Sequence, residues 1–354
     1  MAVTIKDVAR LAEVSVATVS RVMNGTAPVS EGTRIRVLDI ARQLRFAPNG
    51  SARALSRQRT GALGVVLPDL YGEFFSELLR GMDQTAQRAD HSLLVSSSHH
   101  DARGVGFAVR AMRGRVDGLI VMAPELAASD VAEVLPHGLP TILLNGHGQG
   151  EALQSISVDN FGGALAMTRH LLSLGRHRIG FVCGAEHNAD ATARERGHHV
   201  ALRESGESHD RTLDVRGDFT EASGWRAAQR LTALAKPPSA IFAANDAMAV
   251  GALSYLRAAG IEVPTQIAVV GFDDIPVARF LTPPLTTVRV GVAALGARAT
   301  AVLLQALERS PPDALNPRHE VLATELVVRG SCGAPPAAQV PLAPFPLPSE
   351  DLFR

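Results

Sequence analysis

Several features are scarce in this 354-residue sequence, and each scarcity excludes a class of protein. Only two cysteines are present, Cys183 and Cys332, which excludes a disulfide framework. No charge-free window of about 18 apolar residues occurs, so no transmembrane helix and no membrane partner are expected. The first ten residues lack the apolar region of a secretory signal, and we therefore expect a cytoplasmic protein.

The sequence also lacks an excess of either charge, because 35 basic and 35 acidic residues cancel. The two signs are nevertheless unevenly distributed. Residues 1–60 contain ten basic and four acidic residues, a net charge of +6, which leaves −6 on the remainder. A compact basic segment of this kind is typical of nucleic-acid binding, although charge alone is equally compatible with an ordinary solvated surface.

The first 47 residues predict a helix-turn-helix domain. Thr4 and Asp7 have the spacing of a capping box, and apolar residues at helical spacing follow them. Ser15 is a suitable N-cap for a second short helix, and Ser30 for a third. In such a motif the second helix enters the major groove of DNA.

Four stretches carry a more specific pattern: Thr4-Ile-Lys-Asp-Val-Ala-Arg-Leu-Ala12, Val14-Ser-Val-Ala-Thr-Val-Ser-Arg-Val-Met-Asn24, Phe46-Ala-Pro-Asn49 and Ala52-Arg-Ala-Leu55. This pattern resembles the lactose-repressor (LacI–GalR) family of bacterial transcription regulators. The resemblance implies that double-stranded operator DNA, a pseudo-palindrome, is a partner. Glu13 departs from the Gly or Asn that the family often has in the turn. If the turn requires a positive φ, this residue costs about 1 kcal/mol.

The resemblance also implies roles for individual residues. Val16, Ala17 and Arg21 match the base-reading positions, and Arg21 can form two hydrogen bonds with a guanine edge. Other polar side chains would bind DNA phosphates and so fix the position of the domain along the duplex. They are Thr4, Ser15, Thr18, Ser20, Asn24, Ser30 and Thr33. Residues 48–60 would form a hinge from which Ala52 and Leu55 reach the minor groove, with Leu55 as an apolar wedge. The alternative for Leu55 is an ordinary linker residue.

From residue 61 to about residue 330, apolar runs alternate with helical patterns, which predicts βαβ units and parallel sheets. Two such series predict two doubly wound subdomains. We expect the N-subdomain to comprise about 61–159 and 290–317, and the C-subdomain about 160–289 and 318–330. The chain would cross between them near Asp159, Val290 and Pro317.

Motifs in this region extend the resemblance, among them Val116-Asp-Gly-Leu-Ile120, Gly271-Phe-Asp-Asp274 and Leu285-Thr-Thr-Val288. The implied fold is a type I periplasmic-binding-protein-like α/β domain with a small-molecule effector between the subdomains. Residues implied to line that cleft are Phe74, Asn145, Arg196, Phe219, Asn245 and Asp273. Polar residues at the carboxyl ends of strands support part of this set, since ligands of open α/β sheets bind there.

Several alternatives stay open for this cleft. Asn245 would serve equally well as a helix cap, and Phe219 as a core residue. Asn145 stands where many relatives have Asp. This difference is an argument against assigning the effector of any one relative to this chain. A sugar or sugar derivative is the default effector, and a purine or nucleoside is the alternative.

No catalytic motif accompanies the α/β pattern: neither a phosphate-binding G-x-x-x-x-G-K-[ST] loop nor a G-x-S-x-G elbow occurs. We expect neither a cofactor nor a metal site, because the paired histidines at 99–100 and 198–199 are neighbours whose side chains point apart. A sugar-binding transport protein and an α/β enzyme are the alternative functions. The basic N-terminal segment argues against both.

The last 24 residues, 331–354, contain six prolines and no leucine heptad. Such a segment is expected to be extended or disordered, and it cannot form the helical tail that makes some members of the family tetrameric. Reading a palindromic operator requires two recognition helices, so we expect a homodimer.

Overall fold

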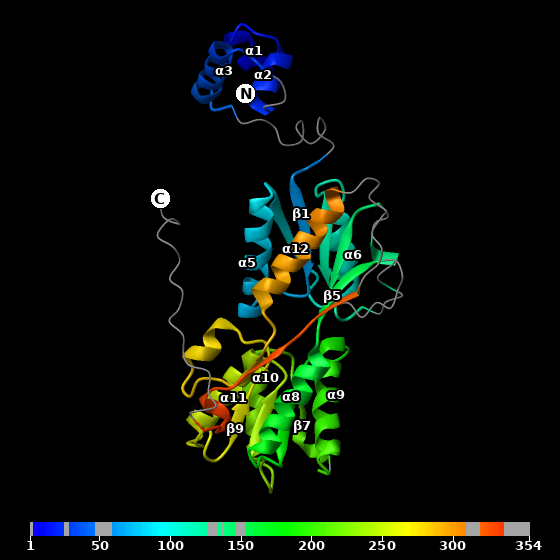
Figure 1. Cartoon of the computed structure of the whole chain (residues 1–354), viewed down its shortest axis with the longest axis vertical. Helices are drawn as coiled ribbons and strands as arrows, with labels where there is room; N and C mark the ends of the chain where they lie inside the picture. The colour runs from blue at the N-terminus through cyan, green and yellow to red at the C-terminus, as the bar shows by residue number, and fades with distance from the viewer. Residues whose placement is uncertain are drawn as a thin grey trace. The chain divides into compact units, whose positions relative to one another are not determined.

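A computed structural model of the chain (Figure 1) describes residues 3–24, 28–46, 59–126, 130, 133–135, 138–145, 153–207, 209–308 and 319–335. The chain divides into two compact units, residues 1–61 and 62–354. The first is called the small unit below and the second the large unit. In the described residues, no helix is both long enough and apolar enough to cross a membrane.

The described residues of the small unit form three helices, α1 (Ile5–Leu11), α2 (Val16–Asn24) and α3 (Glu31–Gln43). They pack around a small core of short apolar side chains: Val8, Ala9, Ala12, Val19, Val37 and Ala41. Small residues allow helices this short to approach closely enough to share a core. Asp7 caps α1, since its carboxylate accepts hydrogen bonds from the backbone N–H of Thr4 at 3.0 Å and from the Thr4 hydroxyl at 2.7 Å.

The N-subdomain of the large unit is built on a six-stranded sheet with the order β11-β5-β4-β3-β1-β2, in which every pair is parallel. Its strands are β1 (Ala62–Leu67), β2 (Ser92–Ser97), β3 (Gly118–Met122), β4 (Thr141–Leu144), β5 (Gln154–Val158) and β11 (His319–Leu322). Its helices are α5 (Glu73–Arg88), α6 (Ala102–Met112) and α12 (Val292–Glu308).

The C-subdomain has a four-stranded parallel sheet with the order β7-β6-β8-β9. Its strands are β6 (Ile179–Cys183), β7 (Asp214–Arg216), β8 (Ala240–Ala243) and β9 (Ala268–Val270). Four helices accompany it: α8 (Asn160–Ser173), α9 (Ala189–Glu204), α10 (Glu221–Thr232) and α11 (Asp246–Ala258). Short 3-10 turns lie at Arg211–Leu213, Pro276–Phe280 and Gly330–Cys332.

The two doubly wound subdomains follow the predicted alternation of strands and helices, but one predicted boundary is wrong. Residues 318–330 were expected to lie in the C-subdomain, whereas β11 pairs with β5 in the N-subdomain sheet. The third crossing therefore follows Leu322, beyond Pro317, which lies outside the described residues. Beyond it, β12 (Glu325–Val327) pairs antiparallel with β10 (Thr287–Arg289), so two of the connecting segments form a ribbon.

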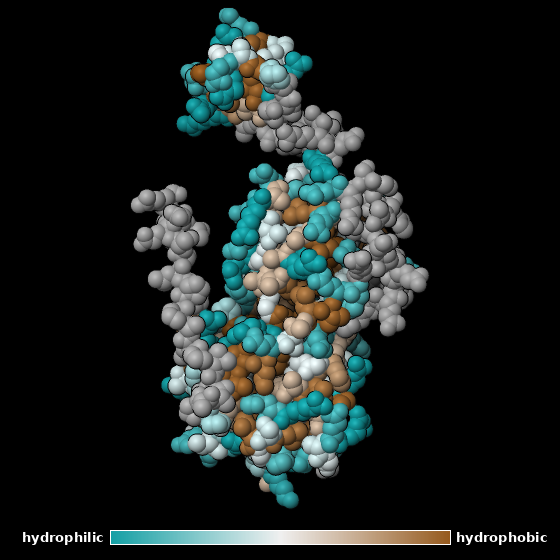
Figure 2. Space-filling model, in the orientation of Figure 1, coloured by the Kyte–Doolittle hydropathy of each residue, from teal (hydrophilic) through white to brown (hydrophobic). Residues whose placement is uncertain are grey.

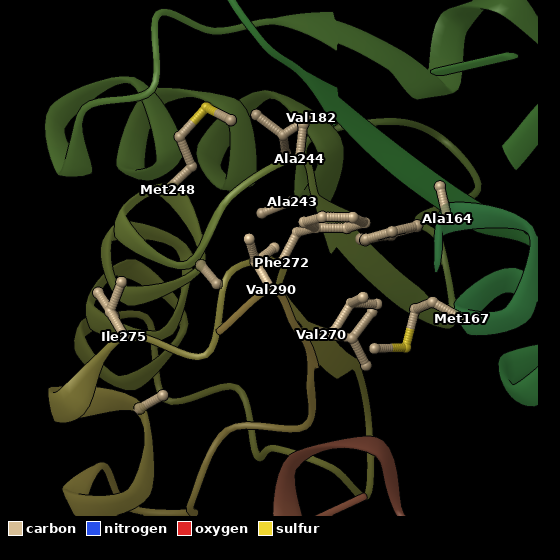
Figure 3. Packing of buried hydrophobic residues seen from close by; sticks show 14 of the residues in the cluster. Ala164, Met167, Val182, Ala243, Ala244, Met248, Val270, Phe272, Ile275 and Val290 are labelled. Atoms are coloured by element: carbon tan, nitrogen blue, oxygen red, sulfur yellow. The ribbon is translucent and has the colours of Figure 1, made fainter. Parts of the chain in front are cut away.

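One cluster of buried apolar side chains spans both sheets of the large unit, and a second cluster between α6 and the N-subdomain sheet is separate from it. Figure 3 shows part of the first cluster around the ring of Phe272, with Ala164, Met167, Val182, Ala243, Ala244, Met248, Val270, Ile275 and Val290. The space-filling view shows apolar residues reaching the surface of the large unit between hydrophilic ones (Figure 2). A shared core gives the two subdomains a common support for a site between them.

Candidate functional site

The first candidate site is the outer face of α2. Val19, on the same helix, is fully buried against α1 and α3, which leaves Val16, Ala17 and Arg21 exposed. Val16 is 41% exposed, which is high for a valine held in a regular helix. An exposed stripe of one apolar residue, one small residue and one arginine can contact base edges in the major groove.

Among the described residues of the small unit, Arg21, Arg36 and Arg45 form no ion pair, unlike three other arginines. Arg10, Arg34 and Arg42 each form an ion pair with an acidic residue three positions earlier in their own helix. Arg21 has no such partner among the described residues, and the first turn of α2 contains no acidic residue. Its guanidinium is therefore available to an external acceptor.

The predicted phosphate-contacting residues lie at or near helix N-termini. Ser15 caps α2, because its hydroxyl accepts the backbone N–H of Thr18 at 3.1 Å. The side-chain oxygens of Ser15 and Thr18 lie 2.8 Å apart, and the Ser30 hydroxyl donates to that of Thr33 at 2.9 Å. Thr4 is exposed in the cap of α1, Ser20 is half-buried on α2, and Asn24 is the last residue of that helix.

Two of the predicted DNA contacts cannot be placed. Ala52 and Leu55, the expected minor-groove residues, lie outside the described residues, as does most of the expected hinge at 48–60. Their assignment stays a prediction. The turn residue Glu13, in contrast, is well defined and has a φ of 49°. The expected backbone strain in this turn is therefore present.

The second candidate site is a cavity of about 340 Å³ in the large unit. It is lined from both subdomains, with Phe74 and Asn145 on the N-subdomain side. Phe219, Asn245 and Asp273 line it from the C-subdomain. Five of the six residues that the sequence placed here are thus brought together, and the carboxyl ends of β1, β4 and β8 point towards the same space.

Arg196 is the exception, and its predicted place in the cleft is wrong. Its side chain is exposed and its guanidinium lies 5.1 Å from the ring centroid of Phe161. The arginine that lines the cavity is Arg194, which is 6% exposed. Two residues separated by two positions on an α-helix project about 200° apart, so an error of two positions exchanges the inner face for the outer one.

Arg194 is held by a buried network. Its Nε donates to Asn160 Oδ1 at 2.8 Å and its Nη1 to the carbonyl of Ala244 at 2.6 Å. Its Nη2 lies 3.3 Å from Asp273 Oδ1, and its guanidinium stacks 3.9 Å from the ring centroid of Phe272. All three guanidinium nitrogens are therefore engaged within the protein.

Two acceptor atoms of this site are buried and accept no hydrogen bond from the described residues. They are Asn145 Oδ1 and Asp273 Oδ1, the latter because its approach to Arg194 has ion-pair distance without hydrogen-bond geometry. Burial raises the pKa of Asp273 to about 7, and the nearby Arg194 limits this rise. Orphaned buried acceptors are costly, so their presence on a cavity wall points to a ligand with hydroxyl or amine donors.

Asn245 and Phe219 combine structural and cavity roles. Asn245 Oδ1 caps α11 by accepting the N–H of Met248 at 2.9 Å, and its amide nitrogen donates to the carbonyl of Phe219 at 3.0 Å. The expected capping role of Asn245 is thus present together with its place in the cavity wall. The ring of Phe219 packs against Gly184, where any β-carbon would collide with it.

Backbone strain accompanies several of these positions. Asn145 has a φ of 51°, Phe219 of 68° and Asp273 of 116°. Asn and Asp adopt positive φ values more readily than Phe does, although a φ of 116° lies outside the left-handed helical region even for Asp, and strained residues of this kind cluster at ligand sites. Strain at three separate cavity residues supports a binding role for the cavity.

A hydrogen bond between two residues of the cavity wall joins the two subdomains. Val277, in the 3-10 turn Pro276–Phe280, donates its N–H to Glu73 Oε2 at 2.9 Å. Glu73 is the first residue of α5, so the bond joins the N-subdomain to the C-subdomain. No signal in the sequence indicates this contact, because the partner of Glu73 is a backbone group 204 residues away.

The neighbouring histidines His198 and His199 have different surroundings. His198 is fully buried, shares a hydrogen bond with Thr168 at 2.9 Å, and burial lowers its pKa to about 3. His199 points elsewhere, to Asp214, so the two neighbours do not share a ligand. However, the fold also brings His209 to Asp214, a convergence that neighbouring positions in the sequence could not indicate.

A helix-turn-helix unit joined to a two-subdomain α/β unit with a cavity defines a class of protein, the ligand-responsive transcription regulators. Family models agree: residues 4–49 match bacterial regulatory proteins of the lacI family, and residues 168–332 match a periplasmic binding protein-like domain. The chain belongs to the lacI family of bacterial regulatory proteins. It is a transcriptional regulator, as its named relatives are.

Two relatives illustrate the extent of the similarity. The HTH-type transcriptional regulator GalR of Escherichia coli strain K12 is 35% identical over 334 residues, which cover 94% of this chain and 96% of that protein. The HTH-type transcriptional repressor CytR of the same strain is 32% identical over 336 residues, covering 95% and 98%.

Solved structures agree with these relatives. The Lac repressor dimer bound to operator and the anti-inducer ONPF has a TM-score of 0.84 and 29% identity, covering 94% of this chain and 100% of that one. A complex of the transcriptional regulator CelR with cellobiose has a TM-score of 0.69 and 30% identity, covering 93% and 99%.

Proposed function

We propose that this protein is a cytoplasmic repressor that binds a pseudo-palindromic operator as a homodimer and responds to an effector in the cavity of the large unit. The single observation that carries the DNA-binding part is the exposed face of α2, where Arg21 lacks the acidic partner that Arg10, Arg34 and Arg42 have. The Lac repressor structure, described as a dimer on its operator, supports the assembly.

The chemistry of the cavity favours a neutral effector rich in hydroxyl groups. Six acidic residues line the cavity: Asp69, Glu73, Asp190, Asp218, Glu221 and Asp273. Among the described residues, only two basic ones line it, and both are already engaged: Arg194 in its buried network and His100 with Glu125 at 2.8 Å. A phosphorylated ligand would therefore meet carboxylates without a free cation to compensate them.

A neutral sugar satisfies these constraints better than a nucleotide. Its hydroxyl groups can donate to the orphaned oxygens of Asn145 and Asp273, and its apolar face can lie against the ring of Phe74 or Phe219. CelR, a regulator of similar fold, is described in complex with cellobiose. A nucleoside is the second candidate, since it is also neutral and can stack on the same rings.

The experiment is a fluorescence-anisotropy titration of the full-length protein with a duplex from the promoter of its own gene. The Arg21→Ala variant should lose about 5- to 150-fold in affinity for that duplex, equivalent to about 1–3 kcal/mol, with no change in unfolding temperature. Arg42→Ala, on α3, is the matched control and should lose much less. Equal affinity of Arg21→Ala and wild type would contradict the proposed role of α2.

The effector part is tested separately by thermal unfolding in the presence of neutral monosaccharides and disaccharides, sugar phosphates and nucleosides. A ligand that binds the folded state raises the unfolding temperature. Neutral sugars should raise it and sugar phosphates should not. A rise with sugar phosphates alone would contradict the assignment from the cavity charges.

A further inference from the structure

Three donor side chains converge on the C-subdomain away from the cavity. His199 belongs to α9, Asp214 begins β7, and His209 lies in the connection between them. Asp214 Oδ2 lies 3.1 Å from His199 Nε2 and 2.7 Å from His209 Nε2. The two imidazole rings are close neighbours, with centroids 4.1 Å apart.

The geometry is nearly that of a metal site. The three donor atoms all lie within 4.8 Å of one another. In a tetrahedral zinc site, bonds of about 2.0–2.1 Å place neighbouring donor atoms about 3.3 Å apart. The two histidine–aspartate distances thus need to lengthen by only a few tenths of an ångström to admit an ion. The same nitrogen, Nε2, is presented by both rings.

The identity of the donors selects the class of ion. Two imidazoles with one carboxylate suit Zn²⁺ and its neighbours in the first transition series, whereas Mg²⁺ and Ca²⁺ prefer sites made entirely of oxygen atoms. Side-chain exposures of 27% for His199, 17% for Asp214 and 34% for His209 keep the cluster open to solvent. A water molecule can therefore occupy the fourth position.

The fold holds each donor in place before an ion arrives. Asp214 pairs with Phe181 in the sheet, and His199 follows His198, which is anchored in the core by Thr168. His209 precedes Asp210, which bonds to the backbone N–H of Thr212 at 3.0 Å. A site whose ligands are already positioned loses little conformational entropy on binding.

We propose that His199, His209 and Asp214 form a binding site for one divalent transition-metal ion, with zinc as the expected occupant. The bound ion fastens the connection that contains His209 to α9 and β7. It therefore stabilises the C-subdomain without touching α2 or the cavity.

The test is a calorimetric titration of zinc chloride into the full-length, untagged and chelator-treated protein. We expect one ion per chain, bound with a dissociation constant in the micromolar range or tighter, and a higher unfolding temperature of the zinc-bound protein. The His209→Gln variant, which changes a partly exposed side chain, should bind zinc at least about tenfold more weakly. Cobalt should give the visible absorption band of a tetrahedral site, and His209→Gln should reduce it.

The control variant is His177→Gln. His177 lies in the same subdomain, and its Nδ1 lies 2.9 Å from a carboxylate oxygen of Glu207. It should bind zinc like wild type. A wild-type dissociation constant above about 100 µM overturns the proposal, as do equal zinc affinities of wild type and His209→Gln. An equal loss of affinity in His177→Gln overturns it as well, because zinc would then bind scattered surface histidines.

Discussion

The two units place their functional side chains in opposite environments. In the small unit, Val16, Ala17 and Arg21 are exposed on a short helix, and the arginine pairs beside them are solvent-accessible contacts between neighbours in sequence. In the large unit, Arg194 and Asp273 are nearly inaccessible and belong to a network that joins several elements. Function can therefore be separated from stability in the small unit, whereas in the cavity the same residues serve both.

The sharpest test of this contrast compares two arginines of one helix. Arg194→Ala removes a buried charge and leaves Asp273 and Asn160 without their partner, which should lower the free energy of unfolding by about 3–5 kcal/mol. Arg196→Ala, which removes only an exposed contact with Phe161, should cost less than about 1 kcal/mol. Urea unfolding followed by the fluorescence of Trp225, the only tryptophan, measures the large unit in both variants.

Equal costs for these two substitutions would break the comparison. This result would show that the buried network contributes no more to the free energy of unfolding than a surface contact does. Arg21→Ala completes the series, because it should reduce DNA affinity while leaving the unfolding free energy unchanged.

A pH titration sharpens the contrast further. In the folded protein, burial raises the pKa of Asp273 from 3.8 to about 7. Between these two pH values the folded protein therefore binds more protons than the unfolded chain does. The contribution of Asp273 to stability is thus fully present below about pH 4 and is lost as the pH rises through about 7, at up to about 1.4 kcal/mol per pH unit.

Asp273→Asn should remove this dependence. Unfolding free energies of wild type and variant, measured at pH 5, 6, 7 and 8, should differ in slope below pH 7 and run parallel above it. The pKa of the buried Asp246 is raised first by burial and second by the charge of Asp273, so Asp273→Asn also lowers the pKa of Asp246 and flattens the curve in the same direction. Parallel curves over the whole range would contradict the assignment to Asp273.

The smallest expected effect concerns the turn of the small unit. Glu13→Gly should stabilise this unit by about 1 kcal/mol, because glycine adopts a φ of 49° without the strain of a β-carbon. Glu13→Ala removes the same charge but keeps the β-carbon, so it should give no comparable gain. Amide hydrogen exchange in α1 and α2 measures the difference, and equal protection in the two variants would exclude strain as the cause.

Sequence reasoning succeeded where structure depends on neighbours along the chain. Capping residues such as Ser15, the three short helices, the strained turn at Glu13 and the alternation of strands and helices all follow from local spacing. The carboxyl ends of strands also located Asn145 and Asn245 correctly on the cavity wall.

It failed where the outcome depends on contacts between distant segments. Whether Arg194 or Arg196 lines the cavity depends on which face of α9 packs against α8 and Asp273. Residues two positions apart lie on nearly opposite faces of a helix, so the sequence alone does not distinguish them. The place of β11 depends on its pairing with β5, about 160 residues earlier, and the Glu73–Val277 bond has no local signal at all. Such contacts are fixed by packing, which no single window of residues specifies.

The positive φ at Asn145, Phe219 and Asp273 limits how this protein can change. Glycine at each position would relieve strain, yet it would also delete a side chain from the cavity wall. Selection for a tighter fold and selection for ligand recognition therefore act in opposite directions at these three positions. A stabilised variant that keeps its effector response must accordingly obtain its gains elsewhere, for instance at Glu13, where the strained residue lies outside the cavity lining.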